Sequence, residues 1–213
     1  MYHSMDATIG QTTNSLWLYA GTGDYERIGN TSNGTDNLMI GIRDPHYPEY
    51  RDVAVPKKAA DLTKCKNTTK DKTGNKCPTS TDTGWYIKLD KSQKVTAEPT
   101  VSSGLVYFPI YKPNADDFCS IGKAYICAVD DECGTNKSVN ELNAEDSAAN
   151  TNKCRTVGSG ILSRIIVFAN KLFANLSGNP AEEEDMVSIK TGVLDAESVR
   201  DSWRENYLSL IHI

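Results

Sequence analysis

The residues of this sequence that are most capable of specific chemistry are its six cysteines. Zinc sites usually take their ligands from close pairs such as C-x-x-C, and no two of these cysteines have that spacing. Cysteines in polar, loop-rich surroundings are typical of exported proteins with structural disulfides. We therefore predict disulfides and no metal. The six candidates are Cys65, Cys77, Cys119, Cys127, Cys133 and Cys154.

Sequence alone leaves many pairings of six cysteines open. The pairing that we favour closes short loops and joins the two ends of a polar segment that follows the fifth cysteine. Each bridge would stabilise the fold by roughly 2 to 4 kcal/mol, because it restricts the unfolded chain. The favoured pairs are Cys65–Cys77, Cys133–Cys154 and Cys119–Cys127.

Side-chain oxygens gather in three further places. A calcium loop needs about six oxygens at tight alternating spacing with a glycine at the turn, and none of these segments contains D-x-D-x-D-G. We interpret all three as solvated polar turns. They contain Asp24, Asn30, Asn33, Asp36 and Asn37 in the first, Asp116 and Asp117 in the second, and Asp130, Asp131 and Glu132 in the third.

Signatures of catalysis are missing. His3, His46 and His212 have no histidine or cysteine neighbour at ligand spacing, and there is no nucleophile elbow, P-loop or H-E-x-x-H. The glycines of GTG at 21–23 resemble a phosphate loop, but no helix follows them to bind the phosphate, so a tight β-turn is predicted. We predict no catalytic, cofactor-binding or metal-ligating residue and no enzymatic activity.

The stretch from Gly84 to Gly134 indicates how the chain is organised. Trp85, Ile87 and Leu89 alternate with polar or half-polar residues, the period of a half-buried strand. Val- and Thr-rich or aromatic runs follow, separated by polar turns predicted at 91–93 and 102–104. We predict four antiparallel strands in one sheet, like a propeller blade. The three later strands are expected over Lys94–Thr100, Leu105–Tyr111 and Lys123–Val129.

Similar phrases recur on both sides of that stretch. LWLYAGTG begins at Leu16 and LMIGIRD at Leu38, and a weaker copy, RIIVFANKLFANLSG followed by DMVSIKTG, begins at Arg164. Repeated strand–turn–strand units are typical of arrays whose units share a core with their neighbours. The predicted fold class is all-β: a partial, modified β-propeller of quinoprotein-like four-stranded blades with long loop insertions.

Composition limits the partners. The net charge is −5 and the pI is about 5.3, which gives nucleic-acid binding no electrostatic support. No apolar run is long enough for a transmembrane helix. The N-terminus lacks the features of a signal peptide, whereas the cysteines indicate an exported protein. We therefore expect a leader upstream of Met1.

The expected divisions are a frayed segment 1–15, a propeller region 16–206 with a mobile insertion 135–153, and a disordered or non-native tail 207–213.

Five segments in order carry a family resemblance. They are LWLYAGTGDYER with LMIGIRD, DTGWYIKLDKSQKVTAEPTVSSGLVYFPIYKPN, DDFCSIGKAYICAVDDECG, RTVGSGILSRIIVF and SWREN. Together they resemble the C-terminal part of PilY-type proteins, large exported factors of type IV pilus assembly that are described as tip adhesins. The resemblance covers most of residues 16–206.

The resemblance implies a modified β-propeller that acts in pilus biogenesis, in the balance of pilus extension and retraction, and in surface attachment. It implies pilins, minor pilins and a host or abiotic surface as partners, and a location at the cell surface or pilus tip, outer-membrane-associated or periplasmic in transit. The family's calcium loop is absent from this chain, so calcium is expected only upstream. A quinoprotein-type oxidoreductase and a generic secreted scaffold are the alternatives.

Overall fold

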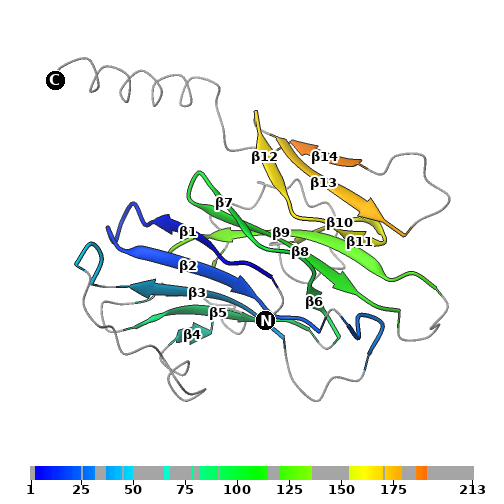
Figure 1. Ribbon diagram of the computed structural model, residues 1–213, viewed down its shortest axis with the longest axis horizontal. Helices are drawn as coiled ribbons and strands as arrows, with labels where there is room; N and C mark the ends of the chain where they lie inside the picture. The colour runs from blue at the N-terminus through cyan, green and yellow to red at the C-terminus, as the bar shows by residue number, and fades with distance from the viewer. Residues whose placement is uncertain are drawn as a thin grey trace.

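The computed structural model contains three β-sheets and, within the described residues, no helix. It describes residues 3–24, 26–31, 37–44, 46–49, 65–67, 78, 82–90, 92–114, 120–135, 154–169, 171–178 and 186–190. The three sheets lie beside one another in chain order (Figure 1). They contain five, five and four strands, which agrees with the predicted all-β fold of blade-like sheets.

The first sheet consists of four antiparallel strands in a meander and one short parallel strand at its edge. Its order is β1-β2-β3-β5-β4. The strand β4 pairs in parallel with β5, and the other neighbours are antiparallel. The strands are β1 (Asp6–Ile9), β2 (Leu16–Gly21), β3 (Leu38–Asp44), β4 (Cys65–Asn67) and β5 (Gly84–Lys88).

The first sheet corrects two predictions. The segment 1–15 is not frayed in its described part, because β1 pairs with β2 along its whole length. The strand β5 does not join the sheet of the strands that follow it, because it pairs with β3, where Trp85 lies opposite Gly41. A Cβ atom on Gly41 would lie only 2.7 Å from Nε1 of Trp85, so the indole needs a glycine as its neighbour.

The second sheet contains the longest strands. Its order is β10-β9-β8-β6, and β7 pairs with the other end of β8. Ser103 and Gly104 connect β7 to β8 with positive φ angles of 53° and 74°, the geometry of a two-residue type I′ hairpin, as the turn prediction required. The strands are β6 (Lys94–Val95), β7 (Thr100–Ser102), β8 (Leu105–Lys112), β9 (Lys123–Asp130) and β10 (Cys154–Ser159).

The third sheet is formed by the weaker repeat. Its central strand β13 pairs with β11 and β12 on one side and with β14 on the other. Phe168 pairs directly with Lys171, so the connection between β12 and β13 is short. The strands are β11 (Ile161–Leu162), β12 (Ile166–Phe168), β13 (Lys171–Ser177) and β14 (Met186–Lys190).

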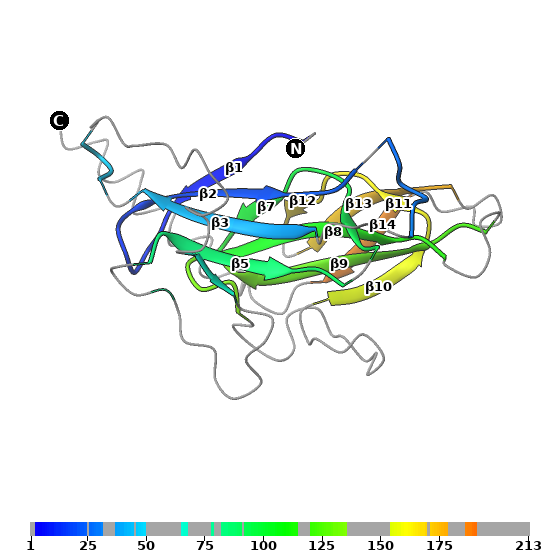
Figure 2. The ribbon, with the colours of Figure 1, turned by 90° about the horizontal axis from the view of Figure 1, so that it is seen from below.

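The second sheet is buried on both faces because it lies between the other two. Alternate residues of β8 point in opposite directions. Val106, Phe108 and Ile110 pack toward the first sheet, whereas Leu105 and Tyr107 pack toward the third. This explains the unbroken apolar run of β8, which is typical of a strand buried on both faces. Figure 2 shows the strands of the first two sheets running in roughly the same direction, as in aligned sheet packing.

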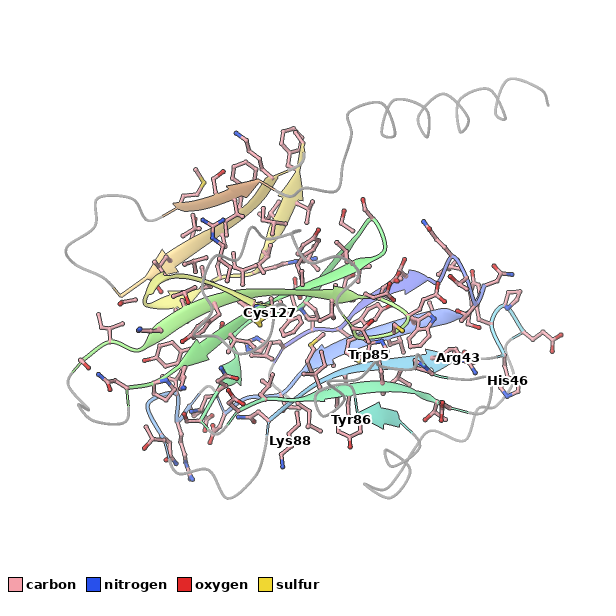
Figure 3. The ribbon with its side chains drawn as sticks, turned by 180° about the vertical axis from the view of Figure 1, so that it is seen from behind. Arg43, His46, Trp85, Tyr86, Lys88 and Cys127 are labelled. Atoms are coloured by element: carbon pink, nitrogen blue, oxygen red, sulfur yellow. A yellow bond between two sulfur atoms is a disulfide. The ribbon has the colours of Figure 1, made fainter. Side chains whose placement is uncertain are left out.

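The phase predicted for β5 is confirmed. Trp85, Ile87 and Leu89 are buried in the core between the first two sheets. Lys88 is exposed and Tyr86 is half-buried. Figure 3 shows Trp85 directed toward the second sheet, and Tyr86 and Lys88 directed to the opposite side.

Candidate functional site

A group of interacting polar and aromatic residues lies where the end of β9 meets the first sheet. Trp85 is completely buried, and its indole N–H donates a hydrogen bond of 2.8 Å to the carbonyl oxygen of Asp131. The Tyr19 ring lies beside the indole, with 6.0 Å between the ring centroids. Gly134 adopts a φ angle of 67°, and a Cβ there would lie 2.6 Å from Cδ2 of Trp85. The turn at 130–135 is thereby shaped around the indole.

The carboxylates of that turn hold backbone amides. Glu132 accepts hydrogen bonds from the N–H groups of Thr12 and Thr13 at 2.7 and 2.9 Å, one on each oxygen. Asp130 accepts from the N–H groups of Glu132 and Cys133 at 3.0 and 2.8 Å. Carboxylate acceptors of this kind make strong, charge-assisted hydrogen bonds. The DDE sequence thus ties the β1–β2 connection to the end of β9.

The oxygen-rich loops show no arrangement of metal ligands in the described part of the chain. No group of three or more His, Cys, Asp or Glu side chains there could hold a metal ion. Asn37 instead donates a 2.8 Å hydrogen bond to the Gln93 carbonyl, and Asp24 lies 3.8 Å from the guanidinium of Arg27. The remaining candidates, Asn33, Asp36, Asp116, Asp117 and His212, lie outside the described residues.

Tyr19 is a buried phenol without a hydrogen-bond partner for its hydroxyl. Burial raises the pKa of Tyr19 above its usual value, and the carboxylates of Asp131 and Glu132 raise it further. The hydroxyl therefore stays protonated throughout the physiological pH range. A phenol of this kind contributes packing and is unsuited to act as a nucleophile or base.

Lys94 is a functional group that the sequence analysis missed. Its side chain is almost completely buried, and its ammonium donates to the carbonyl oxygens of Asn30, Ile28 and Ser92 at 2.7, 3.0 and 3.4 Å. Burial lowers the pKa of Lys94, and the charge of Asp24 opposes that shift. Nothing in the sequence distinguishes this lysine from exposed ones, because its three acceptors belong to the backbone.

The GTG segment does not form the tight turn that was predicted. Thr22 continues the ladder by donating its N–H to the carbonyl of Leu38, and its own carbonyl accepts from the N–H of Val95. A Cβ on Gly23 would lie 2.8 Å from the Val95 carbonyl oxygen. The glycines allow the first sheet to approach β6 of the second sheet closely, which is a role of glycine in backbone–backbone contacts.

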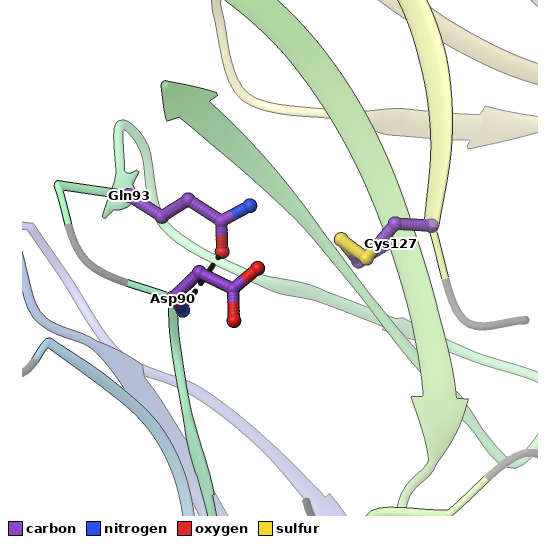
Figure 4. Close-up of a disulfide and its surroundings, with 4 residues drawn as sticks. Asp90, Gln93 and Cys127 are labelled. Atoms are coloured by element: carbon purple, nitrogen blue, oxygen red, sulfur yellow. Dashed lines mark hydrogen bonds between the residues drawn. A yellow bond between two sulfur atoms is a disulfide. The ribbon is translucent and has the colours of Figure 1, made fainter. Parts of the chain in front are cut away.

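One disulfide of the described chain joins Cys127 to Cys154 across β9 and β10, with 1.99 Å between the sulfur atoms (Figure 4). The two cysteines are directly opposite each other in the ladder. This contradicts the favoured pairs Cys119–Cys127 and Cys133–Cys154, because the preference for short loops ignored strand pairing.

Cys133 is also disulfide-bonded, to a cysteine whose side chain is not described. The side chains of Cys65, Cys77 and Cys119 lie outside the described residues, so the pair Cys65–Cys77 stays a prediction.

The same close-up shows the connection between the first two sheets. The N–H of Asp90 donates a 3.0 Å hydrogen bond to Oε1 of Gln93 (Figure 4), and the N–H of Gln93 donates to the Asp90 carbonyl at 3.1 Å. This reciprocal turn follows β5 and leads the chain into β6. It explains how the predicted polar turn at 91–93 redirects the chain from the first sheet to the second.

Comparisons with known proteins agree with this architecture. No family model matches the sequence, and no curated protein matches it. A solved structure does: the crystal structure of the Pseudomonas aeruginosa PilY1 C-terminal domain, with a TM-score of 0.55 and 12% identity. The chain has a PilY-like β-propeller fold. The match covers 88% of this chain and 44% of the solved one, so the chain spans less than half the length of its structural neighbour.

Two divisions of the sequence receive no structural description. The insertion 135–153 is described only at Thr135, and the tail 207–213 together with the SWREN motif lies outside the described residues. Among the residues that the structure describes, none forms a helix long and apolar enough to cross a membrane.

Proposed function

We propose that this chain is a non-enzymatic module of type IV pilus biogenesis and tip adhesion, which supports pilus assembly and surface attachment. The observation that carries the proposal is the match to the PilY1 C-terminal domain over 88% of the chain. The order of the five sequence segments points independently to the same family. Low identity limits the match to the fold, so the pilus role is an inference from fold and motif order together.

The chemistry of the described residues supports a binding role. Side chains of types that serve catalysis in other proteins have structural roles here. Glu132 accepts hydrogen bonds from backbone amides, and Lys94 donates hydrogen bonds to backbone carbonyls. Tyr19 is completely buried in the core. A protein of this kind acts through its surface. Pilins and minor pilins, together with a host or abiotic surface, are the partners that we propose.

The disulfide supports an exported location. Cys127 and Cys154 form a bridge in the core between strands, and such bridges persist mainly in oxidising compartments. We therefore place the protein at the cell surface or the pilus tip, with passage through the periplasm.

Deletion of the segment that encodes residues 16–206, in the gene of the source bacterium, tests the proposal. We expect fewer surface pili by electron microscopy and weaker attachment, both restored by the wild-type segment. As a matched pair, Lys88→Ala should restore both, whereas Trp85→Ala should restore neither, because it removes a fully buried side chain. Normal piliation and attachment after deletion would contradict the proposal. So would quinone-dependent dye reduction by the purified protein, which would instead favour the oxidoreductase.

A further inference from the structure

A positive charge is enclosed where the first two sheets come together. Lys94 is only 1% exposed, although lysine usually extends its ammonium into water. It lies in β6 next to Val95, a residue of the core between these sheets. A buried charge costs much free energy unless other groups replace the hydrogen bonds that water made. The surroundings of Lys94 therefore have to supply those hydrogen bonds.

Three backbone carbonyl oxygens surround the ammonium. They belong to Asn30, Ile28 and Ser92 and lie 2.7, 3.0 and 3.4 Å from Nζ. A lysine ammonium has three N–H donors and no acceptor, so each donor has one oxygen. We call these three carbonyl groups the carbonyl cage. It replaces water around the charge as carbonyl oxygens replace the hydration shell of potassium in a channel filter.

The carbonyl cage joins two connections that are far apart in the chain. Ile28 and Asn30 lie between β2 and β3, whereas Ser92 lies in the turn between β5 and β6. A second contact joins the same segments, because the Asn37 side chain donates a 2.8 Å hydrogen bond to the Gln93 carbonyl. The ammonium adds a charged contact to this neutral one. Its removal should therefore loosen the β2–β3 connection.

The β2–β3 connection is also the first of the three oxygen-rich segments of the sequence. Calcium binds about six to eight oxygens at about 2.3 to 2.6 Å, and every distance in the carbonyl cage is longer. Three neutral oxygens at these distances suit a monovalent cation better. Burial lowers the pKa of Lys94, and the charge of Asp24, in the same connection, opposes that shift. Asp24 thus favours a positive charge in the cage.

We propose that the carbonyl cage is a monovalent-cation site whose resident cation is the Lys94 ammonium, and that this cation orders the β2–β3 connection as a bound metal ion would. The chain supplies the cation covalently, so the connection needs no metal from solution. A shorter side chain at position 94 should leave the cage open to a free ammonium or potassium ion.

Hydrogen exchange of the purified 213-residue chain, measured by mass spectrometry of peptides that cover residues 26–31, tests the site. In Lys94→Ala these amides should exchange about 10-fold faster or more, as expected when hydrogen bonds to a charged group are lost. Ammonium chloride and potassium chloride should restore slow exchange. Tetramethylammonium chloride at the same concentration should not, because that cation is too large for the cage.

Lys94→Met is the matched control, since it fills the same space without a charge. Its amides at 26–31 should exchange as fast as those of Lys94→Ala. Ammonium chloride should not slow them, because the thioether side chain occupies the cage. Restoration of both variants would indicate a general effect of salt, and restoration of neither would mean that the cage binds no free cation. Either result would overturn the proposal.

Two measurements on the wild type apply even if the variants do not fold, which circular dichroism would reveal. The Lys94 ammonium should give a nitrogen-15 NMR signal at neutral pH, because an enclosed, hydrogen-bonded ammonium exchanges its protons slowly. Exchange at 26–31 should not change when calcium chloride or EDTA is added. A missing ammonium signal, or exchange that depends on calcium, would overturn the proposal. All these measurements use the purified chain, so their outcome is independent of the pilus role.

Discussion

The two interfaces of this molecule hold sheets together in different ways. The interface between the first and second sheets contains aromatic side chains and directional hydrogen bonds. The Trp85 indole donates to the carbonyl oxygen of Asp131, and Glu132 accepts from two N–H groups of the β1–β2 connection. The interface between the second and third sheets is mainly aliphatic, with small residues such as Ala124 and Ala174. Its hydrogen bonds include those from the Thr96 and Thr100 hydroxyls to backbone carbonyls, and Arg164 forms an ion pair with Glu98.

This difference shows that one fold can use two kinds of specificity. Aromatic rings matched to glycines allow one arrangement, because each ring fills a space that a single Cβ would close. Aliphatic side chains repack more freely, and a core of the right volume tolerates substitution at small cost. We therefore expect the first interface to be the more sensitive to mutation.

Replacement of the central indole should have the largest effect. Trp85→Ala removes a fully buried side chain and should lower the free energy of unfolding by about 3 to 5 kcal/mol. That is a large part of a typical domain stability of about 5 to 15 kcal/mol. Urea denaturation followed by circular dichroism measures it. Lys88→Ala on the same strand is the control and should change stability by less than about 0.5 kcal/mol; the reverse order would mean that the strand phase is wrong.

Removal of the bridge between β9 and β10 should have the next largest effect. The double variant Cys127→Ala/Cys154→Ala should lose about 2 to 4 kcal/mol, because the unfolded chain is no longer constrained across 27 residues. Thermal unfolding without reductant measures the loss. Non-reducing peptide mapping of the wild type should recover Cys127 linked to Cys154, and a fragment that links Cys127 to Cys119 would restore the pairing that the strand ladder contradicts.

A conservative change at the second interface should have a smaller effect. Ile189→Val deletes one methylene from a buried side chain of β14 and should cost about 0.5 to 1.5 kcal/mol, because the aliphatic surroundings relax into part of the space. Its urea midpoint should lie close to that of the wild type. A loss as large as that of Trp85→Ala would remove the contrast between the two interfaces.

The smallest effect at neutral pH is expected for Tyr19→Phe, since the hydroxyl that it removes has no hydrogen-bond partner. The pKa of Tyr19 is raised in the folded chain, so above about pH 10 the unfolded chain releases a proton that the folded chain keeps. The wild type should therefore lose stability as the pH rises beyond that value, and the variant should lose less. Paired denaturation curves at pH 7 and in the alkaline range measure the difference; parallel pH profiles would show that Tyr19 contributes nothing to it.

The sequence by itself determined most of the longer strands and the buried side of β5. It missed β1, and it predicted a single strand over Lys94–Thr100 where the structure has β6 (Lys94–Val95) and β7 (Thr100–Ser102). Alternation places Trp85, Ile87 and Leu89 together, because side-chain direction depends only on local backbone geometry. The turns at 91–93 and 103–104 could also be predicted, since their polar or glycine residues suit the required φ angles. The order of motifs further indicated the PilY-like fold.

Only the tertiary structure decided which strands become neighbours. It assigned β5 to β3, joined Cys127 to Cys154, used the GTG glycines for close approach and surrounded Lys94 with carbonyl oxygens. Each of these depends on residues far apart in the chain, whose pairing is set by the total burial of apolar surface and the closing of backbone hydrogen bonds. A local sequence pattern does not show which distant strand will lie beside it. The sequence therefore indicates strands, and the packing of whole sheets determines which strands are in contact.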